Sequence, residues 1–354
     1  MRHLVDITDL TPAEREALLD LGEEMLRHPG DFADAARGRI LATLFFEPST
    51  RTRLSFESAM QSLGGGTLGF AEASSSSAAK GEGVADTVRV AGCYADLIAM
   101  RHPKEGAALM GALYAPVPVI NAGDGGHCHP TQTLTDLLTI RRELGRVDGL
   151  TVGLCGDLKY GRTVHSLVNA LAAYRDVRLV FISPEELRIP AYMKEGVLRR
   201  MSYAETDSLA DALPGLDLLY MTRIQRERFA DPEEYLRLRD SFLLTPELLR
   251  PAGEHMAVLH PLPRVGEISA AVDGDPRAAY FRQARCGRFV RMALIHTLLS
   301  GALGPAPARD LREHPGRVCP NPVCITHAER EPRRLFLEEG GVCRCAYCEA
   351  EANL

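Results

Sequence analysis

The stretch FFEPSTRTRLSFESAM, residues 45–60, marks a junction between a strand and a helix. An apolar run, ILATLFF at 40–46, leads into it and is typical of a buried strand. After it, SFESAMQSLGG at 55–65 is typical of a helix that stops at paired glycines. Between the two, residues 49–53 bring hydroxyl side chains and two arginines together. So much polarity at this point of the chain suggests a binding site.

The start of a helix is a natural place to hold an anion. Free backbone N–H groups and the positive end of the helix dipole point outward there together. The hydroxyls of Ser49, Thr50 and Thr52 can donate further hydrogen bonds to phosphate oxygens. Arg51 offers a planar fork that suits phosphate. The junction therefore predicts a phosphate site, and the alternative is a capped helix whose arginines form solvated ion pairs.

The rest of the chain alternates short apolar runs with amphipathic segments, which predicts an α/β fold with parallel sheets and helices on both faces. Strands are expected at residues 40–46, 96–101, 117–123, 150–157, 177–183, 216–222 and 256–263. A helix is expected from Thr11, where a cap, an early proline and early acids coincide. Nearly every expected strand ends in a charged or hydroxyl-rich motif. Open α/β sheets bind ligands beyond the carboxyl ends of their strands, so the site is expected there.

Length and composition are typical of a globular protein of two or three domains. The chain has 354 residues, of which 45% are hydrophobic and 25% charged. The sequence contains no uninterrupted apolar run of about 18 residues, so it offers no candidate membrane span. The N-terminal segment carries acids where a signal peptide needs an apolar core. We therefore expect a cytoplasmic protein without membrane contact. A formal net charge of -6 argues against a general nucleic-acid binder.

A second motif, NAGDGGHCHPTQTLTDLLTI at residues 121–140, places His129 where a glycine-rich segment leads into a helix. A histidine at such a turn can donate a proton or a hydrogen bond to a carbonyl oxygen near neutral pH. The alternative is a turn residue whose hydrogen bonds are satisfied within the protein. The neighbouring His127 has no comparable case for catalysis.

Six motifs in order make the chain resemble the catalytic chain of aspartate carbamoyltransferase, from near residue 5 to about residue 300. They are STRTR at 49–53, MRHP at 100–103, HPTQ at 129–132, GDLKYGRTVHS at 156–166, MTRIQ at 221–225 and HPLPR at 260–264. Six ordered motifs are far more specific than any one of them. The resemblance implies transfer of the carbamoyl group of carbamoyl phosphate to the amino group of L-aspartate, in pyrimidine (UMP) biosynthesis.

The resemblance also implies the carbamoyltransferase fold, which has two doubly wound parallel-sheet domains. A carbamoyl-phosphate-binding domain is expected at residues 1–130, completed by a C-terminal helix at 287–301. An aspartate-binding domain is expected at 131–286, and a small zinc-binding domain at 318–354. The segment 302–317 is rich in Gly, Pro and Ala and lacks periodicity, which predicts a linker.

The carbamoyl-phosphate site follows from the resemblance, motif by motif. A dianionic phosphate must be held while the adjacent carbonyl is attacked, so donors are needed at the leaving group and at the developing oxyanion. The phosphate is implied to bind the run Ser49, Thr50, Arg51, Thr52 and Arg53. The carbonyl oxygen is implied to bind Thr52, Arg101 and His129. The carbamoyl nitrogen is implied to bind Gln132 and the carbonyls of Pro261 and Leu262, beside a Leu262–Pro263 bond expected to be cis.

Aspartate carries two carboxylates, and the resemblance assigns them to Arg162 and Arg223, with Gln225 nearby. Bidentate arginine is the natural partner of a carboxylate. No metal or redox cofactor is implied for catalysis, because orienting two small molecules against fixed charges can supply much of the rate. Glu47 and Glu82 are implied to pair with arginines of the site, and the alternative is that they are ordinary solvated acids. The implied catalytic residues are Arg51, Thr52, Lys80, Arg101 and His129.

The segment ASSSSAAKGEG, residues 73–83, predicts a mobile surface loop. The resemblance implies that Ser76 and Lys80 reach into the active site of a neighbouring subunit. Both would contact carbamoyl phosphate there, and Lys80 would also contact aspartate. A one-residue slip along the serines would select Ser75 or Ser77 instead. The implied assembly is a homotrimer with shared active sites.

Five of the nine cysteines crowd into residues 319–348. In a reducing compartment such a cluster predicts a metal site before it predicts disulfides. Two separate pairs of thiolates suit a closed tetrahedral zinc site, and a module of under about 40 residues has too small a core to fold without such a staple. Structural Zn²⁺ is therefore expected on Cys319, Cys324, Cys345 and Cys348. A set with Cys343 in place of Cys345 is the alternative.

This tail resembles the zinc domain of the separate regulatory chain of aspartate carbamoyltransferase, through CPN at 319–321 and ITHAE at 325–329. In that family the zinc domain packs against catalytic chains and links trimers. Here it is fused to the catalytic chain, and the nucleotide-binding domain that normally precedes it is missing. We therefore do not expect feedback by nucleotides at that domain. Our hypothesis is that the fused module serves assembly beyond the trimer.

Three other functions are weighed against this one. Another carbamoyltransferase, specific for ornithine, would recognise a cationic side chain and characteristically carries a cysteine where Pro261 stands, whereas Arg223 and Gln225 favour a dicarboxylate. A catalytically silent scaffold subunit of the same fold predicts losses among the motif residues, and none is lost. A zinc-finger nucleic-acid binder needs a basic tail, but six acids between Glu329 and Glu351 accompany its arginines.

Overall fold

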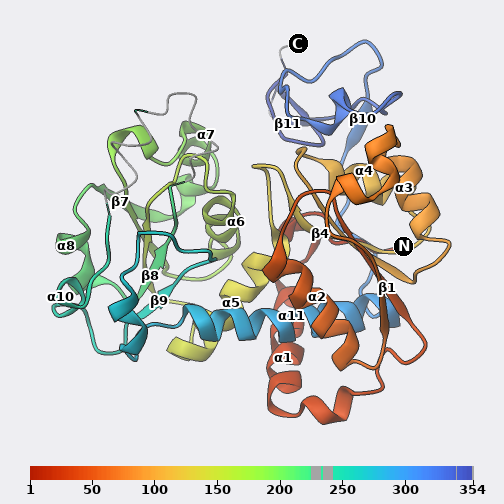
Figure 1. The fold of residues 1–354 in the computed structure, drawn as a ribbon. Helices are drawn as coiled ribbons and strands as arrows, with labels where there is room; N and C mark the ends of the chain where they lie inside the picture. The colour runs from red at the N-terminus through yellow and green to blue at the C-terminus, as the bar shows by residue number, and fades with distance from the viewer. Residues whose placement is uncertain (225–232, 234–241, 340, 353–354) are drawn as a thin grey trace. The chain divides into compact units, whose positions relative to one another are not determined.

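The computed structural model describes residues 1–224, 233, 242–339 and 341–352 (Figure 1). The contacts between residues divide the chain into two compact units. The first unit comprises Met1–Thr131 and Arg288–Leu354, and the second comprises Gln132–Gly287. Among the described residues, no helix combines the length and the apolar character that crossing a membrane requires.

The first unit is built on a parallel sheet in the order β2-β1-β3-β4. Its strands are β1 (Ile40–Phe45), β2 (Gly66–Phe70), β3 (Leu97–His102) and β4 (Val119–Asp124). Strand β1 lies between β2 and β3, so the direction in which successive strands are added reverses there. At such a reversal, the loops beyond the carboxyl ends leave a crevice for a ligand.

Helices cover both faces of this sheet. They are α1 (Pro12–Arg27), α2 (Thr50–Ser62), α3 (Val84–Ala91), α4 (Ala107–Tyr114) and the C-terminal part of α11 (Tyr280–Ser300). Successive side chains of a strand point to opposite faces. Ala42 and Leu44 of β1 belong to a core cluster with α3 and α4, whereas Thr43 donates its hydroxyl to Glu57 of α2 at 3.1 Å. The sheet is therefore covered on both sides, as its mostly apolar strands require.

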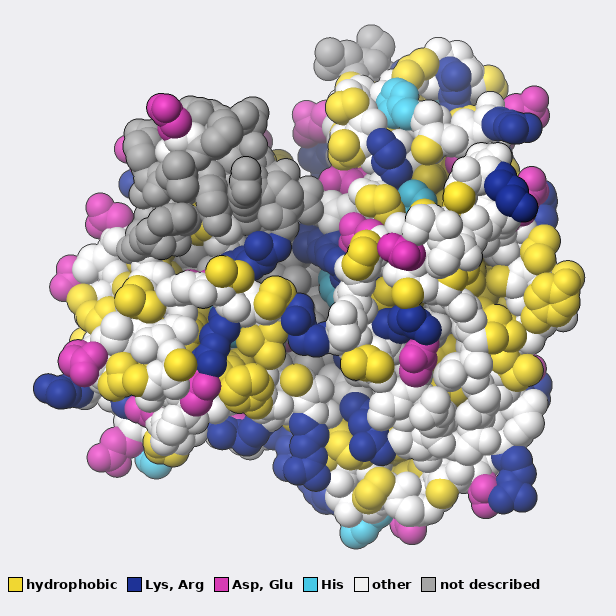
Figure 2. Space-filling view, in the orientation of Figure 1, with side chains coloured by type: hydrophobic (Ala, Val, Ile, Leu, Met, Phe, Trp, Pro, Cys, Tyr) yellow, Lys and Arg dark blue, Asp and Glu magenta, His cyan; other side chains and the backbone are white. Residues whose placement is uncertain are grey.

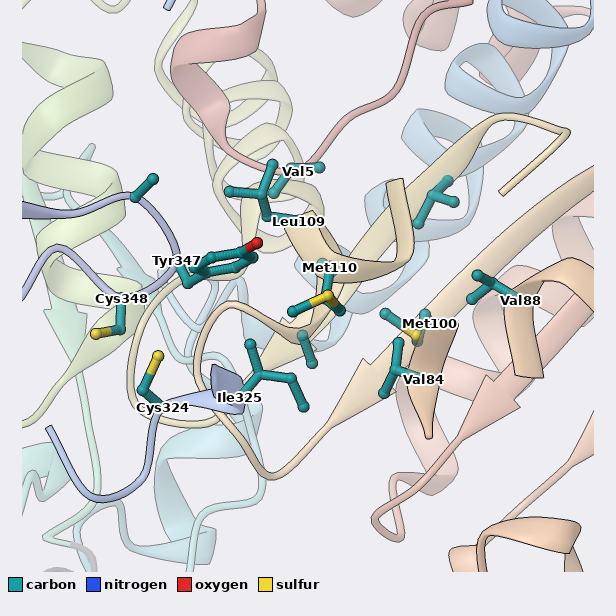
Figure 3. Close-up of a cluster of buried hydrophobic side chains, with 14 of the residues drawn as sticks. Val5, Val84, Val88, Met100, Leu109, Met110, Cys324, Ile325, Tyr347 and Cys348 are labelled. Carbon is teal, nitrogen blue, oxygen red and sulfur yellow. The ribbon is translucent and has the colours of Figure 1, made fainter. Parts of the chain in front are cut away.

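Within the first unit, a C-terminal module, residues 318–352, packs against helices α3 and α4. It contains β11 (Leu335–Glu339) and β12 (Val342–Cys345), and β11 pairs antiparallel with both β12 and β10 (Leu311–Glu313). Strand β10 falls within residues 302–317, the segment expected as a linker. Figure 3 shows Ile325 and Tyr347 of the module beside Val84, Leu109 and Met110, which belong to the same buried cluster. The module and the sheet thus share one hydrophobic core.

The second unit has a parallel sheet in the order β7-β6-β5-β8-β9. Its strands are β5 (Thr151–Cys155), β6 (Arg178–Ile182), β7 (Ser202–Thr206), β8 (Leu218–Met221) and β9 (Ala257–Leu259). Its helices are α5 (Pro130–Leu144, from residue 132), α6 (Arg162–Leu171), α7 (Ala191–Glu195), α8 (Leu209–Ala212), α10 (Pro246–Leu249) and the start of α11. The strand order reverses between β5 and β8, which gives this unit its own crevice position.

Side chains of β8 show that this second sheet is also covered on both faces. Leu219 and Met221 join a core cluster with α8 and α10. Tyr220, between them, donates its hydroxyl to Asp136 of α5 at 2.9 Å. Short single turns connect the elements of the two units, namely η1 (Ile7–Asp9), η2 (Pro29–Phe32), η3 (Ala73–Ser75), η4 (Ser77–Lys80), η5 (Glu185–Leu187), η6 (Val197–Arg200), η7 (Leu213–Gly215), η9 (Ala270–Gly274) and η10 (Ile325–His327).

All seven strands expected from the sequence are present, and the helix expected from Thr11 begins at Pro12 with a full capping box. Strands β10, β11 and β12 of the C-terminal sheet were not expected from the sequence, and neither were β2 and β7. The last two are edge strands of their parallel sheets, and neither contains a fully buried residue. An edge strand that buries little lacks the apolar run by which interior strands are recognised, which explains the omission.

Candidate functional site

The helix start predicted to bind phosphate lies at the strand reversal of the first sheet. Helix α2 begins at Thr50, five residues after β1 ends at Phe45. Its N-cap residue, Ser49, makes no side-chain capping bond, whereas Thr11 caps α1 by accepting from the backbone N–H of Glu14 at 3.2 Å. A helix start without a side-chain cap leaves its first N–H groups to water or to a ligand. The start of α2 is therefore suited to an anion.

The two arginines of this motif differ in their surroundings. Arg53 donates from Nε to Glu57 Oε1, one helical turn on, at 2.7 Å. Arg51 is exposed at the first turn of α2. Arg51 stands nearer the start of the helix than Arg53, and its planar guanidinium suits an incoming anion there.

Arg101 lies on the strand next to this helix start. It is the direct partner of Phe45 in the β1–β3 pairing, and its backbone carbonyl accepts from Phe46 at 2.8 Å. Its guanidinium lies 2.7 Å from Glu47 Oε1, with 15% of its side chain exposed. Burial lowers the pKa of Arg101, and the charge of Glu47 opposes that effect. The acid thus keeps a cation at the edge where β1 and β3 end.

His129 is buried at the turn between β4 and α5. Its Nδ1 lies 3.4 Å from the hydroxyl of Thr131, which in turn accepts from Arg291 Nη2 at 3.3 Å. The other terminal nitrogen of Arg291 donates to Ser55 of α2 at 3.1 Å. Arg291 therefore ties the His129 turn to the helix of the predicted phosphate site, a role that the sequence analysis did not foresee.

His127 belongs to a separate network in the same glycine-rich segment. Its Nδ1 lies 3.2 Å from Asp124 Oδ2, and burial, which lowers its pKa, is outweighed by Asp124, so that the pKa rises to about 10. Asp124 also accepts from Asn121 and from the backbone N–H of Gly106. The ligand atoms of Asp124, His127 and Cys128 lie close enough together to bind one metal ion. Both oxygens of the Asp124 carboxylate, however, already accept hydrogen bonds within the protein. The group fits a structural turn.

Ser76 and Lys80 lie on the exposed segment that follows β2. The sequence predicts a loop there, and the structure shows two short turns, η3 and η4. Ser76 caps η4 by accepting from Ala78 N at 3.3 Å, and it donates to Ala73 O at 2.9 Å. Lys80 ends η4 and is exposed. Glu82 accepts from Ser77 and Thr87, so its described partners are hydroxyls instead of an arginine.

In the second unit, Arg162 and Arg223 follow the two strands that flank the strand reversal. Arg162 is the first residue of α6, whose N-cap is Gly161 and makes no side-chain bond. Arg223 follows β8 by two residues, and β5 pairs with β8 through Cys155 and Met221. Both arginines are half-buried at the same edge of the sheet. Gln225, the third residue predicted here, lies outside the described residues.

The turn that carries Pro261 and Leu262 follows β9 and is held by a buried pair. The Leu262–Pro263 bond is cis, as expected. His260 Nδ1 accepts from Leu262 N at 2.7 Å, and its Nε2 lies 2.7 Å from Glu267 Oε1. Burial acts to raise the pKa of Glu267, but hydrogen bonds from His260 and from two backbone N–H groups lower it to about 2. Glu267 therefore holds His260, and His260 holds the turn.

Asp136 connects this turn to Gln132. Gln132 Nε2 donates to Asp136 Oδ1 at 2.7 Å, and Gln283 Nε2 donates to the same oxygen at 2.6 Å. Gln283 also accepts from the backbone N–H of His260 at 2.9 Å. The groups predicted to bind the carbamoyl nitrogen are thus joined by one buried network. Asp136 is an acid among the apolar residues Leu134, Leu137 and Leu138, and this was the signal in the sequence that could have revealed the network. Asp136 was not among the residues predicted for the site.

Four cysteines of the C-terminal module form a candidate metal site. The Sγ atoms of Cys319, Cys324, Cys345 and Cys348 lie within 4.8 Å of one another, and all four residues are buried. Cys319 Sγ lies 3.4 Å from Cys348 Sγ, and Cys324 Sγ lies 3.9 Å from Cys345 Sγ. Zinc–sulfur bonds of about 2.3 Å in a tetrahedron place sulfurs about 3.8 Å apart, so this donor set fits zinc.

The fifth cysteine and the histidine of the module have other partners. Cys343 accepts a hydrogen bond from Arg317, and it lies outside the four-cysteine cluster. His327 bonds through Nε2 to the carbonyl of Cys319 at 2.8 Å. Thr326 donates to Cys324 Sγ at 3.3 Å, the kind of outer contact that orients a metal ligand. These contacts favour the set with Cys345 over the alternative with Cys343.

Arginines and acids are mixed over the surface of the C-terminal module. Arg333 pairs with Glu313 at 3.2 Å, and Arg344 pairs with Glu351 at 3.1 Å. Figure 2 shows basic and acidic side chains together over this part of the molecule. Such mixed charge differs from the basic surface that nucleic-acid binders use.

Three family descriptions match the chain. Residues 2–142 match the carbamoyl-P binding domain of aspartate/ornithine carbamoyltransferase, and residues 148–298 match its Asp/Orn binding domain. Residues 318–353 match the metal binding domain of the aspartate carbamoyltransferase regulatory chain.

Curated relatives and solved structures agree with these matches. The aspartate carbamoyltransferase catalytic subunit of Lachnoclostridium phytofermentans is 58% identical over 302 residues, which cover 85% of this chain and 98% of that protein. The corresponding subunit of Clostridium botulinum, strain Okra, is 56% identical over 84% of this chain and 98% of its own length. The catalytic subunit of M. jannaschii aspartate transcarbamoylase matches with a TM-score of 0.80 and 47% identity, over 86% of this chain and 100% of that chain. Aspartate transcarbamoylase of Trypanosoma cruzi, solved with carbamoyl phosphate and aspartate, matches with a TM-score of 0.80 and 39% identity, over 84% and 96% of the two chains.

Proposed function

This chain belongs to the aspartate carbamoyltransferase family, and on that basis we propose that it transfers the carbamoyl group of carbamoyl phosphate to the amino group of L-aspartate. The products are N-carbamoyl-L-aspartate and phosphate, in pyrimidine (UMP) biosynthesis. One observation carries the proposal beyond family membership. Each parallel sheet reverses its strand order once, and at each reversal arginines and an uncapped helix start stand beyond the carboxyl ends of neighbouring strands.

The first unit supplies the groups for carbamoyl phosphate. The start of α2 receives the phosphate through its N–H groups and through the side chains of Ser49, Thr50, Arg51, Thr52 and Arg53. Thr52, Arg101 and His129 donate to the carbonyl oxygen, where negative charge develops during attack. Support comes from the neighbouring strand ends of β1 and β3 and from Arg291, which joins α2 to the His129 turn.

The second unit supplies the groups for aspartate. Arg162 and Arg223 receive its two carboxylates, because bidentate arginine suits a carboxylate better than lysine does. Gln225 is proposed as a further aspartate-binding residue. Gln132 and the carbonyls of Pro261 and Leu262 hold the carbamoyl nitrogen. The buried network through Asp136 and Gln283 supports this role, since it fixes Gln132 and the His260 turn together.

The reaction is then an acyl transfer without a bound redox group. The amino nitrogen of aspartate attacks the carbonyl carbon, a C–N bond forms, and the C–O bond to phosphate breaks. The departing phosphate accepts the proton that the amine loses. The protein orients both substrates and stabilises the oxyanion, which makes the attack effectively unimolecular.

A substrate comparison tests this proposal. Purified full-length chain is supplied with carbamoyl phosphate and either L-aspartate or L-ornithine, and carbamoylated product is measured. We expect product with aspartate and little with ornithine, because Arg162 and Arg223 repel a cationic side chain. Product with ornithine alone would identify another carbamoyltransferase, and no product with either would favour a silent scaffold subunit.

We also propose that the four-cysteine site holds structural Zn²⁺. The support is that Cys319, Cys324, Cys345 and Cys348 are buried, with their Sγ atoms within 4.8 Å of one another. Metal analysis of the purified chain should find about one zinc per chain. Cys345→Ser should lose the zinc and leave the module unfolded, because binding and folding of such modules are coupled. Cys343→Ser is the matched control and should keep it; the reverse pattern would assign the ligand to Cys343.

The assembly that we propose is a homotrimer in which Ser76 and Lys80 enter a neighbouring subunit's site, with the zinc module as the contact for any higher assembly. Its support is the exposed position of Lys80 at the end of η4. Mixing the inactive variants Lys80→Ala and Arg51→Ala should restore part of the activity, since a hybrid trimer contains some sites with neither change. No recovery after subunit exchange would contradict shared sites. Mass measurement before and after chelation tests the role of the module in assembly.

The functional domains that we propose are 1–130 with the helix 287–301 for carbamoyl phosphate, 131–286 for aspartate, 318–354 for zinc, and 302–317 as the connection. We place the protein in the cytoplasm. The support is that all nine cysteines are free, which suits a reducing compartment.

A further inference from the structure

The C-terminal module makes a specific contact with the start of helix α3. The N-cap residue of α3 is Gly83, which has no side chain and supplies no capping bond. The backbone N–H of the next residue, Val84, donates instead to Glu329 Oε1 at 2.6 Å. Glu329 comes from the module, 245 residues away in sequence. A carboxylate at a helix N-terminus is favoured by hydrogen bonding and by the helix dipole.

Gly83 leaves the space that this carboxylate fills. A Cβ atom at position 83 would meet Glu329 Oε2 at 2.5 Å, so the carboxylate would have to shift from its present position. At a second contact, a Cβ on Gly106 would meet Tyr347 Cβ at 2.3 Å. Asn321 of the module also donates to Glu105 Oε2 at 2.6 Å. Within the first unit, the segment before α3 and the segment before α4 thus lie in close contact with the module.

Helix α3 is in turn bonded to the segment that carries Lys80. Glu82 Oε1 accepts from Thr87 of α3 at 2.8 Å and from Ser77 of η4 at 2.6 Å. The same Thr87 hydroxyl lies 2.9 Å from the carbonyl of Gly83. A continuous set of hydrogen bonds therefore runs from Glu329 through the start of α3 to η4, which ends at Lys80.

We propose that Glu329 is a positioning residue: it caps α3 from the C-terminal module and so fixes the base of the segment 73–83 that presents Ser76 and Lys80. The apolar contacts of Ile325 with the α3 and α4 cluster hold the module where Glu329 reaches Val84 (Figure 3). The folded, metal-bound module is then part of the structure that orders this segment. The consequence for catalysis rests on the proposed function, in which Lys80 contacts both substrates.

The test compares variants of the zinc-loaded full chain. Glu329→Ala removes the cap, Glu329→Gln keeps an oxygen that can accept from Val84, and Glu331→Ala removes an exposed acid two residues away as the matched control. Hydrogen exchange is followed at residues 76–87, together with zinc content and the KM for each substrate. Losing a helix cap should speed exchange at Val84 by about 3- to 30-fold.

For Glu329→Ala we expect faster exchange over residues 76–87, unchanged zinc content and a several-fold rise in KM for both substrates. Glu329→Gln should restore most of the wild-type behaviour, and Glu331→Ala should match wild type. Chelation of zinc from the wild type should speed exchange at the same residues. These outcomes separate positioning from a general loss of stability, which would lower the active fraction and leave KM unchanged.

Two results would overturn the proposal. Unchanged exchange at Val84 in Glu329→Ala would show that Glu329 does not cap α3, and faster exchange with unaltered KM would show that the cap does not position the segment. If the wild type turns over neither substrate, the proposed function fails by itself. In that case the exchange rates alone test whether Glu329 caps α3.

Discussion

Helices α2 and α6 begin at equivalent places in the two sheets, each beyond a strand end beside a reversal of strand order. Neither start has a side-chain cap. They differ in where the positive charge sits. At α2 the arginines follow two residues of backbone and hydroxyl donors, whereas α6 opens with Arg162 directly.

This difference suits the two anions that we assign to them. A phosphate has oxygens on all sides and can be surrounded by N–H groups, hydroxyls and one guanidinium. A carboxylate has two oxygens in one plane and is matched best by an arginine fork. The two units therefore use the same sheet topology, with the polar groups arranged for differently shaped ligands.

Removing the arginine at the start of α2 should have the largest effect. Arg51→Ala should lower kcat by about 10²- to 10³-fold, because it removes charge stabilisation at the departing phosphate. Arg51→Lys should recover only part, since lysine lacks the planar fork. Arg53→Ala should cost less, because Arg53 stands farther from the start of α2 than Arg51 does. Steady-state kinetics measure all three, and equal losses for Arg51 and Arg53 would contradict the distinction drawn between them.

In the second unit, removing an arginine should weaken the binding of aspartate more than it slows turnover. Arg223→Ala should raise the KM for aspartate by roughly 30-fold, the equivalent of about 2 kcal/mol for a truncated carboxylate partner. The KM for carbamoyl phosphate should change little. The measurement is a pair of substrate titrations. A rise confined to carbamoyl phosphate would mean that the ligands of the two units have been assigned the wrong way round.

The turn at His260, in the second unit, gives the protein a pH dependence of its own. The pKa of Glu267 is about 2 in the folded protein against an ordinary value of 4.5. Because the folded pKa is lowered, the stability that this carboxylate contributes is present above about pH 4.5 and is lost as the pH falls toward 2. Thermal unfolding between pH 3 and 7 should show a shallower slope for Glu267→Gln than for the exposed control Glu254→Gln. Identical slopes for the two variants would show that Glu267 does not contribute to the pH dependence of stability.

The smallest effect is expected from a substitution of Ser49, the N-cap residue of α2, which makes no side-chain capping bond. Ser49→Ala should change the stability of the ligand-free protein by less than about 0.5 kcal/mol, because Ser49 makes no side-chain capping bond. Thr11→Ala, at the fully capped start of α1, should cost about 1 kcal/mol. Phosphate added to the two variants sharpens the contrast, since only Ser49→Ala should gain less stability than wild type. A large loss for Ser49→Ala without ligand would show that the α2 start is stabilised from within.

Much of this fold was predictable because the interior strands are local signals. The runs at 40–46 and 150–157 are mostly apolar, and the polar motifs stand where those runs end. The edge strands β2 and β7 were missed because strands that bury little carry no such signal. The four cysteines that gather were predicted from spacing, because a closed thiolate site requires two pairs.

The residues that support the predicted site were not predictable in the same way. Asp136, Arg291 and Glu267 act on partners that lie far from them along the chain or across a turn. A buried acid or arginine signals that a partner exists, but the sequence does not say which residue it is.

By itself, the sequence determined the interior strands of the two parallel sheets, the start of α1, the ordered motifs and which four cysteines gather, because each depends on residue type and spacing within short segments. The tertiary structure alone decided which strand ends are neighbours, that Asp136 joins Gln132 to the His260 turn, and that Glu329 caps a helix 245 residues away. The physical reason is that burying polar groups requires partners, and chain packing chooses those partners from anywhere in the sequence.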